Sequence, residues 1–247
     1  MRLPRLQKAW NEAGKTDPYW AVLSDPQKKG NRWKIDEFFQ TGISEIDALM
    51  RDLDALDLEI AHGRALDFGC GPGRLSQALA RYFDHVDGVD ISPSMIELAK
   101  TSNAQGDRVQ YHVNDRDDLQ VFTSGSFDLV YSSLTLQHVR PPLMRRYLGE
   151  FFRVLKPSGL AVFQVPSRPG GGLGRLKRWI PGFAFEAYRR LAYGNHPAIA
   201  MYGMAKHEVL DVCARNGATV IDVAPTPRDR KWESFRYVAR PGRPATR

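Results

Sequence analysis

The fold is decided by residues 65–74, which read Ala65-Leu-Asp-Phe-Gly-Cys-Gly-Pro-Gly-Arg74. A short apolar run carries an acidic residue, Asp67, near its end and is followed by glycines at positions 69, 71 and 73. Because glycine has no Cβ, the backbone of such a turn can approach a ligand closely. The stretch therefore predicts a strand, a ligand-binding turn and the start of a helix.

Short apolar runs alternate with helical patterns on both sides of this stretch, which is typical of a sheet built from βαβ units. The predicted strands are Ala65–Phe68, Val86–Asp90, Val109–Val113, Asp128–Ser132, Leu160–Val165, Ala218–Val223 and Ser234–Arg240. A helix is predicted over His207–Asn216, where Gly217 ends it. The pattern predicts the α/β fold class, with a doubly wound, mostly parallel sheet of seven strands.

We expect residues 1–240 to form a single domain, followed by a flexible tail at 241–247. An apolar stripe from Ile43 to Leu56 predicts a helix that covers the sheet, whereas residues 1–42 look aromatic and irregular. Within the domain, the expected parts are an N-terminal helical and aromatic cap (1–62), a cofactor-binding core (63–166), an inserted lid on the acceptor side (167–204) and the final helix and strands (205–240).

The composition, 43% hydrophobic and 26% charged, predicts a globular chain. The opening residues lack the apolar core of a secretory signal, and no apolar run is long enough to span a bilayer, so we expect a cytoplasmic location. Cys70 and Cys213 are the two cysteines, which argues against a disulfide framework, and no metal site is expected. The net charge of +7 leaves nucleic acid, an anionic membrane surface and an acidic substrate open.

The spacing of a second acidic residue indicates an adenosine ligand. Asp90 lies at a strand end, 17 positions beyond Gly73, where a carboxylate can accept both hydroxyl hydrogens of a ribose. A dinucleotide site normally has the pattern G-x-G-x-x-G, but this turn has G-x-G-x-G, and Pro72 removes one N–H. Asp67 would repel a pyrophosphate yet suits a cationic sulfonium or amino group. The turn therefore favours S-adenosyl-L-methionine over NAD.

At these residues the chain resembles the class I S-adenosylmethionine-dependent methyltransferases, of the type 11/25-like group that acts on small molecules. The resemblance covers about Ala65 to Val165. Its motifs are Leu66-Asp-Phe-Gly-Cys-Gly-Pro-Gly-Arg74, Val89-Asp90-Ile91-Ser92, Asn114-Asp115-Arg116, Ser126-Phe-Asp-Leu-Val130 and Arg153-Val-Leu-Lys-Pro-Ser-Gly159. The resemblance implies a Rossmann-like sheet whose last strand is antiparallel, and methyl transfer with S-adenosyl-L-homocysteine as the product.

The resemblance also implies a cofactor site. Gly69 and Gly71 would lie along the methionine part, Asp90 on the ribose, and Ile91 and Met95 against the adenine. Asp115 would accept a hydrogen bond from the adenine amino group. The full set is Asp67, Gly69, Cys70, Gly71, Gly73, Asp90, Ile91, Met95, Asn114, Asp115, Arg116, Ser132, Leu134 and His138.

Two histidines are candidates for a catalytic base, because a positioned histidine can take the proton of a hydroxyl acceptor during attack. His138 follows the fourth predicted strand, and a base and a pocket-shaping role both stay open for it. His196 lies in the insertion expected to face the acceptor. Phe39–Gly42 is a candidate lid over the donor, with hydrophobic helix packing as the alternative.

The insertion carries much of the positive charge. Its charged residues are Arg168, Arg175, Lys177, Arg178, Arg189 and Arg190, opposed by Glu186. Aromatic residues alternate with them, so residues 168–190 could bind an anionic or lipid-linked acceptor or contact a membrane peripherally. A solvated lid over an ordinary small substrate is the simpler interpretation.

The leading hypothesis is O-methylation of a small hydroxylated metabolite, sugar or lipid-linked precursor. The alternatives are an RNA or other nucleic-acid methyltransferase, a non-catalytic S-adenosylmethionine-binding module and a nicotinamide dehydrogenase. Tyr131-Ser-Ser-Leu134 stands where amino-methylating nucleic-acid enzymes of this fold carry Asn/Asp-Pro-Pro-aromatic, which disfavours nucleic acid as a partner. The sequence does not select an acceptor atom or an oligomeric state.

Overall fold

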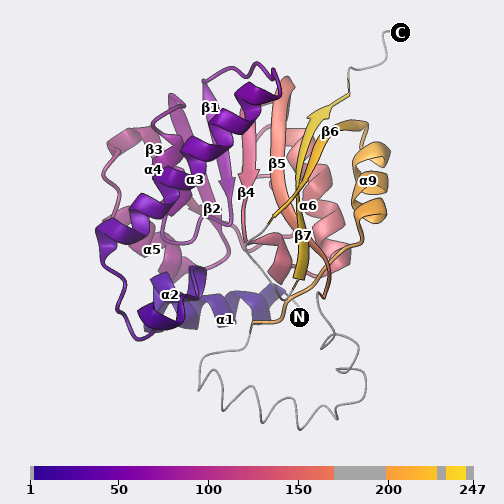
Figure 1. Ribbon diagram of the computed structural model, residues 1–247. Helices are drawn as coiled ribbons and strands as arrows, with labels where there is room; N and C mark the ends of the chain where they lie inside the picture. The colour runs from indigo at the N-terminus through magenta and orange to yellow at the C-terminus, as the bar shows by residue number, and fades with distance from the viewer. Residues whose placement is uncertain (1–2, 170–198, 227–231, 243–247) are drawn as a thin grey trace, which may run out of the picture.

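The computed structural model describes residues 3–169, 199–226 and 232–242 (Figure 1). Seven strands form one sheet in the order β3-β2-β1-β4-β5-β7-β6. Neighbouring strands from β3 to β5 pair in parallel, and β7 is antiparallel to both β5 and β6. The strands are β1 (Arg64–Phe68), β2 (His85–Asp90), β3 (Val109–Val113), β4 (Phe127–Ser132), β5 (Leu155–Pro169), β6 (Ala218–Pro225) and β7 (Trp232–Pro241). The expected α/β class and its antiparallel last strand are confirmed.

The largest difference from the predicted strands is in β5, which was expected at Leu160–Val165. Its first residue, Leu155, pairs with Phe127 of β4 before a register shift, and its last residue, Pro169, pairs with Trp232 of β7. Pairing with partners on both sides extends the strand beyond its apolar centre. Hydrophobic periodicity marks only that centre, because the flanking Lys156-Pro-Ser and Ser167-Arg-Pro segments are polar.

Helices cover both faces of the sheet (Figure 1). On one face lie α3 (Ile35–Ala55), α4 (Arg74–Leu79) and α5 (Pro93–Thr101), and on the other lie α6 (Pro141–Val154) and α9 (Lys206–Arg215). Adjacent residues of β1 point to opposite faces, as the twofold period of a strand requires. A separate hydrophobic core lies on each face of the sheet. Ala65 packs in the core with α3 and α4, and Leu66 packs in the core on the opposite face with α6.

The expectation that residues 1–42 are irregular is wrong. They form α1 (Leu3–Thr16), α2 (Pro18–Val22), the short 3-10 helix η1 (Pro26–Lys28) and the first turns of α3. Phe39–Gly42, the candidate lid, lies inside α3, and the neighbouring Phe38 is fully buried. The ring of Phe38 lies 4.7 Å from that of Tyr19, so the aromatic residues of this segment join helices to one another.

Within the described ranges, no helix combines the length and the apolar character needed to cross a membrane. Most of the insertion, residues 170–198, and the tail from 243 lie outside the described residues.

The crossing of α3 and α4 leaves no room for a side chain at Gly42. A Cβ added there would lie 2.4 Å from the carbonyl oxygen of Arg74, which belongs to the backbone and cannot rotate away. We expect Gly42→Ala to lower the free energy of unfolding by about 1–3 kcal/mol, although alanine has the higher helix propensity. Chemical denaturation measures this difference.

Gly149→Ala in α6 is the matched control. An added Cβ there would lie 2.8 Å from Oδ1 of Asn216, the end of a flexible side chain that can turn away. Its free energy of unfolding should stay within about 1 kcal/mol of wild type. If Gly42→Ala were as stable as Gly149→Ala, the close α3–α4 contact would be contradicted.

Candidate functional site

The glycine turn, Gly69–Gly73, joins β1 to α4 in a backbone conformation that favours glycine. Gly69, Gly71 and Gly73 have φ angles of 79°, 53° and 86°. The amide groups of Gly69 and Cys70 both donate to the carbonyl oxygen of Val89, at 2.8 and 2.9 Å. A Cβ on Gly69 would lie 2.2 Å from the side chain of Thr135. The turn is therefore held against β2 and the loop after β4.

Asp90 at the end of β2 connects three of the predicted motifs. Its carboxylate accepts hydrogen bonds from the backbone amides of Gly71 (3.0 Å) and Ser92 (2.8 Å), and its carbonyl oxygen accepts one from Asn114 (2.9 Å). Burial raises the pKa of Asp90 to about 6, against the opposing effect of the backbone hydrogen bonds. Each carboxylate oxygen has a second lone pair, so the group can still accept hydroxyl hydrogens.

Asp67 is buried directly before the glycine turn. Its Oδ2 accepts a hydrogen bond from Ser76 at 2.7 Å, whereas Oδ1 has no hydrogen-bond partner within the described structure. Burial raises the pKa of Asp67 to about 7, although the Ser76 hydrogen bond and the Arg74 charge lower it. A buried carboxylate with one oxygen that lacks a hydrogen-bond partner suits a cationic ligand group and would repel a phosphate. Together with the glycine turn, Asp67 fits S-adenosylmethionine.

Gly73 serves packing more than ligand approach. A Cβ at this position would lie 2.4 Å from the hydroxyl oxygen of Tyr111 on β3. That hydroxyl is buried without a hydrogen-bond partner in the described structure, and burial raises its pKa above the usual value. Cys70 also faces inward: its thiol is buried in the core under α4, which raises its pKa well above the usual range. Cys70 therefore contributes its backbone, and not its thiol, to the ligand-facing side of the glycine turn.

The loop after β2 lies under α1. Gln7 donates through Nε2 to the carbonyl oxygen of Ile91 at 3.1 Å, and Ser94 donates its backbone N–H to Oδ1 of Asn11 at 3.0 Å. Met95, predicted to face the adenine, is buried, and Gly14 of α1 packs above it. Helix α1 therefore covers the loop that carries Ile91 and Met95.

The predicted adenine-side turn follows β3 and is held by its own side chains. Asn114 is buried and donates through Nδ2 to the carbonyl oxygen of Asp118 at 2.8 Å. Arg116 pairs with the Asp118 carboxylate at 3.1 Å. Asp115 is exposed, and its side chain makes no hydrogen bond or ion pair with the described residues.

The end of β4 brings Ser132 and Leu134 beside the glycine turn. Ser132 donates through Oγ to the carbonyl oxygen of Phe68 at 3.1 Å, and Thr135 donates to that of Gly69 at 3.3 Å. Leu134 has a φ angle of 61°, a conformation that costs free energy for a residue with a Cβ. The carboxyl ends of β1 to β4 thus assemble the predicted cofactor residues into one site.

His138 lies in the 3-10 helix η3 (Leu136–His138), with both ring nitrogens engaged. Nδ1 lies 3.2 Å from the carbonyl oxygen of Ala200, and Nε2 lies 3.1 Å from Nε2 of Gln137. Because a carbonyl can only accept, Nδ1 carries the hydrogen and Nε2 accepts from the Gln137 amide. The ring of Trp10 meets the imidazole edge-on at 5.1 Å. Burial lowers the pKa of His138 to about 4, so the ring is neutral at pH 7.

His196, the second histidine candidate, lies outside the described residues. Residues 170–190 of the basic segment also lie outside them. Two features of the site were missed from the sequence. One is α1, whose apolar positions Leu3, Leu6, Trp10 and Ala13 have helical spacing that could have revealed it. The other is a buried ion pair, described next, which no local pattern marks.

The ion pair joins Arg74, directly after the glycine turn, to Glu45 of α3. Arg74 Nη1 lies 3.0 Å from Glu45 Oε2, and their side chains are 3% and 11% exposed. Tyr131 of β4 donates its hydroxyl to the other Glu45 oxygen at 3.0 Å. Burying a charged pair is tolerated where further hydrogen bonds satisfy it, and here Tyr131 supplies one.

Part of the chain is similar to known methyltransferases. Residues 65–159 match the family described as methyltransferase domain. The ubiquinone biosynthesis O-methyltransferase of Xanthomonas oryzae pv. oryzae (strain PXO99A) is 32% identical over 130 residues, which cover 52% of this chain and 54% of that protein. The demethylmenaquinone methyltransferase of Leptospira interrogans is 35% identical over 133 residues, half of each chain. The chain thus spans about half the length of the curated relatives it matches.

Solved structures agree on the fold. Magnesium protoporphyrin IX methyltransferase from Synechocystis PCC 6803, with S-adenosylhomocysteine bound, has a TM-score of 0.67 at 17% identity and covers 98% of this chain and 100% of that one. An S-adenosylmethionine-dependent methyltransferase from Mesorhizobium loti has a TM-score of 0.56 at 25% identity, and the match covers 77% of this chain and 96% of that one. Residues 65–159 therefore match a methyltransferase domain, and the chain shares its fold with S-adenosylmethionine-dependent methyltransferases of known structure.

Proposed function

We propose that this chain is an enzyme that transfers a methyl group from S-adenosylmethionine to a hydroxyl group of a small molecule. The observation that carries the proposal is the buried Asp67 carboxylate directly before the glycine turn, one oxygen of which has no hydrogen-bond partner among the described residues. The names of the relatives, which include an O-methyltransferase of ubiquinone biosynthesis, support a small hydroxylated acceptor. A lipid-linked acceptor and a peripheral membrane contact through residues 168–190 stay predictions from the sequence.

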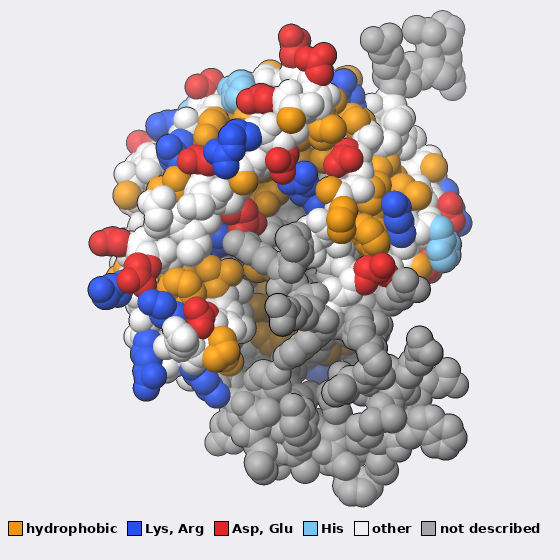
Figure 2. Space-filling view, viewed as in Figure 1, with side chains coloured by type: hydrophobic (Ala, Val, Ile, Leu, Met, Phe, Trp, Pro, Cys, Tyr) orange, Lys and Arg blue, Asp and Glu red, His pale blue; other side chains and the backbone are white. Residues whose placement is uncertain are grey.

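The charge pattern on one face of the described structure supports a small acceptor over a nucleic acid. On the face in Figure 2, the Lys and Arg side chains of the described residues are interspersed with Asp and Glu side chains. Nucleic-acid binding generally needs basic side chains gathered on one face or along a groove. This arrangement favours the small-molecule hypothesis over the nucleic-acid alternative.

The proposed chemistry needs positioning more than acid–base work. When bound, S-adenosylmethionine would supply a methyl carbon on a positively charged sulfur. The acceptor oxygen would bond to that carbon, the C–S bond would break with its electron pair left on the sulfur, and the hydroxyl proton would pass to water. Asp67 would hold the cationic end, Asp90 the ribose, and Ile91 and Met95 the adenine face. Alignment of the two reactants can supply much of the rate.

For His138 the geometry favours a pocket-shaping role over the base. A base works best when its pKa lies near the operating pH, whereas the pKa of His138 is about 4. Its Nε2 lone pair already accepts from Gln137, and Nδ1 donates to Ala200. Neutral His138 therefore holds the 199–205 segment and Trp10 next to the end of β4.

The first prediction concerns the ribose. Asp90→Ala should raise the Kd for S-adenosylhomocysteine about 10- to 100-fold, because charge-assisted hydrogen bonds to the ribose are lost. Isothermal titration calorimetry checks this result, with Asp107→Ala, an exposed acid outside the site, as the control. Wild type should bind S-adenosylmethionine and S-adenosylhomocysteine and not NAD. Unchanged affinity in Asp90→Ala would remove the ribose assignment.

The second prediction is a pH dependence of binding. With a pKa of about 7, Asp67 is largely protonated at pH 6 and largely ionised at pH 8. A cationic ligand binds the ionised form, so affinity for S-adenosylmethionine should rise through this range, and binding should release a proton. Calorimetry in buffers of different ionisation enthalpy measures the proton count. Asp67→Asn should flatten this dependence, and a flat wild-type profile would contradict it.

The third prediction separates the two roles of His138. His138→Ala should weaken S-adenosylhomocysteine binding and lower kcat/KM by similar factors, because the loop after β4 loses two anchors. Steady-state kinetics and calorimetry on the same variant give both numbers, with His85→Ala, exposed at the start of β2, as the control. A rate loss of about 100-fold or more at unchanged affinity would instead identify His138 as the base.

A further inference from the structure

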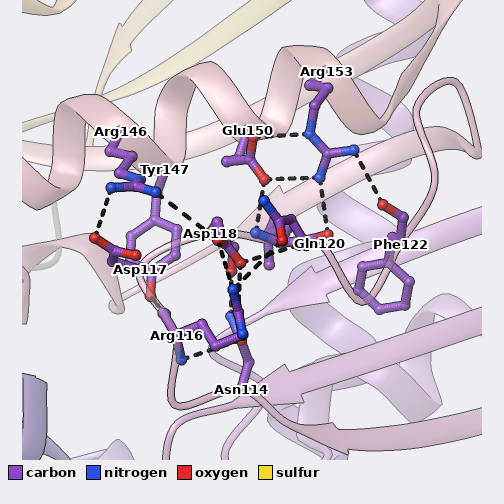
Figure 3. A network of polar contacts seen from close by, with 11 residues as sticks. Asn114, Arg116, Asp117, Asp118, Gln120, Phe122, Arg146, Tyr147, Glu150 and Arg153 are labelled. Atoms are coloured by element: carbon purple, nitrogen blue, oxygen red, sulfur yellow. Dashed lines mark hydrogen bonds and ion pairs between the residues drawn. The ribbon is translucent and has the colours of Figure 1, made fainter.

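The turn after β3 is attached to α6 at several points between residue 116 and residue 122 (Figure 3). Four hydrogen bonds run from side chains of the helix to backbone atoms of the turn, and Arg146 adds ion pairs to two carboxylates of the turn. A backbone atom keeps its place in the chain whatever side chain it carries. Attachment through backbone atoms therefore fixes the path of the turn itself.

Glu150 and Arg153 form the larger attachment. They pair through two contacts, Nε–Oε1 at 2.8 Å and Nη2–Oε2 at 2.7 Å. Glu150 accepts the backbone N–H of Leu119 at 2.7 Å, and Arg153 donates to the carbonyl oxygens of Leu119 (2.9 Å) and Phe122 (3.1 Å). The paired charges thus satisfy both backbone groups of Leu119, whose side chain is fully buried.

Tyr147 lies one helical turn before Glu150 in α6 and holds the first part of the loop after β3. Its hydroxyl donates to the carbonyl oxygen of Arg116 at 2.6 Å. Its ring lies 4.7 Å from that of Phe68, the residue that precedes the glycine turn. Tyr147 therefore sets the position of Arg116 relative to Gly69.

Asp115 differs from its neighbours in the turn. Asn114 and Asp118 use their side chains within the turn, and Asp117 pairs with Arg146 of α6 at 2.7 Å. Asp115 is exposed, lies between two anchored residues, and makes no hydrogen bond or ion pair within the described part of the chain. The backbone on both sides of Asp115 is therefore held, and its carboxylate is left available to a ligand.

We propose that Tyr147 and Glu150 are positioning residues that hold Asp115 where its carboxylate reads the base of the cofactor as adenine. The inference rests on the proposed function, because it takes S-adenosylmethionine as the ligand. Adenine offers an amino group that donates to a carboxylate, whereas hypoxanthine offers a carbonyl oxygen that a carboxylate repels. A carboxylate in a fixed position can therefore discriminate between the two bases, and a loosely held one discriminates less.

The experiment compares two ligands on each variant by calorimetry: S-adenosylhomocysteine and its deaminated analogue, S-inosylhomocysteine. Wild type should bind the adenine ligand at least about tenfold more tightly. Tyr147→Phe and Glu150→Gln, which keep the shape of the two side chains, should each reduce this ratio about threefold or more. Asp115→Asn, an exposed substitution that leaves the anchors intact, should abolish the preference.

The control is Arg145→Gln, which breaks an ion pair between α6 and Glu208 of α9 (2.9 Å) without touching the turn. It should keep the wild-type ratio. A general loss of stability lowers both affinities together and leaves their ratio unchanged, so the ratio isolates positioning. Thermal melting of each variant confirms that it is folded.

The outcomes separate the two proposals. Failure of wild type to bind either ligand would overturn the proposed function itself. Wild-type preference for adenine that survives in Asp115→Asn, or in both Tyr147→Phe and Glu150→Gln, would overturn this inference and leave the proposed function intact. A reduced ratio in the anchor variants, with an unchanged ratio in Arg145→Gln, supports it.

Discussion

The double hydrogen bond that Asp90 accepts from Gly71 and Ser92 is the interaction on which the site depends. The glycine turn has three residues at positive φ, a conformation that glycine adopts readily but that loses much backbone freedom on folding. A carboxylate at the tip of the neighbouring strand offsets part of that cost with two charge-assisted bonds. The same carboxylate is proposed to bind the ribose. The residue that shapes the site in the absence of ligand would thus also be the one that recognises the ligand.

The two ends of the proposed ligand site are supported from opposite faces of the sheet. On the α3 side, Gly42 packs against the backbone of Arg74, and Glu45 holds the Arg74 guanidinium beside the glycine turn. On the α6 side, Tyr147 and Glu150 hold the turn after β3. The sheet lies between them and fixes their separation, because parallel strands β1 to β4 end at a common edge. A substitution in the core on the α3 side would therefore displace the glycine turn, whereas one in the core on the α6 side would displace the turn after β3.

Much of this arrangement could be predicted from the sequence, because strands with buried centres and a glycine turn at a strand end leave strong local patterns. Six strands were expected close to their positions, β5 was expected only at its apolar centre, and Asp67, Asp90 and the three glycines were expected at the site from their spacing. Contacts between distant segments leave no such pattern. Nothing around Gly73 indicates that Tyr111 lies against it, and nothing around Glu45 indicates a buried partner at Arg74. The apolar spacing of α1 could have revealed the helix but not where it docks, because Gln7 and Asn11 bind partners more than 80 positions away.

The position of α1 has a consequence for how the protein is made. The helix precedes Ile91, Ser94 and His138 in the chain and is synthesised before them, yet it contacts all three in the folded protein. A segment with few apolar residues gains little from forming a helix alone, and domains are completed only as their later parts leave the ribosome. Helix α1 can therefore reach its final place only after these later segments have been made, and the loop after β2 gains its cover when much of the sheet has already formed.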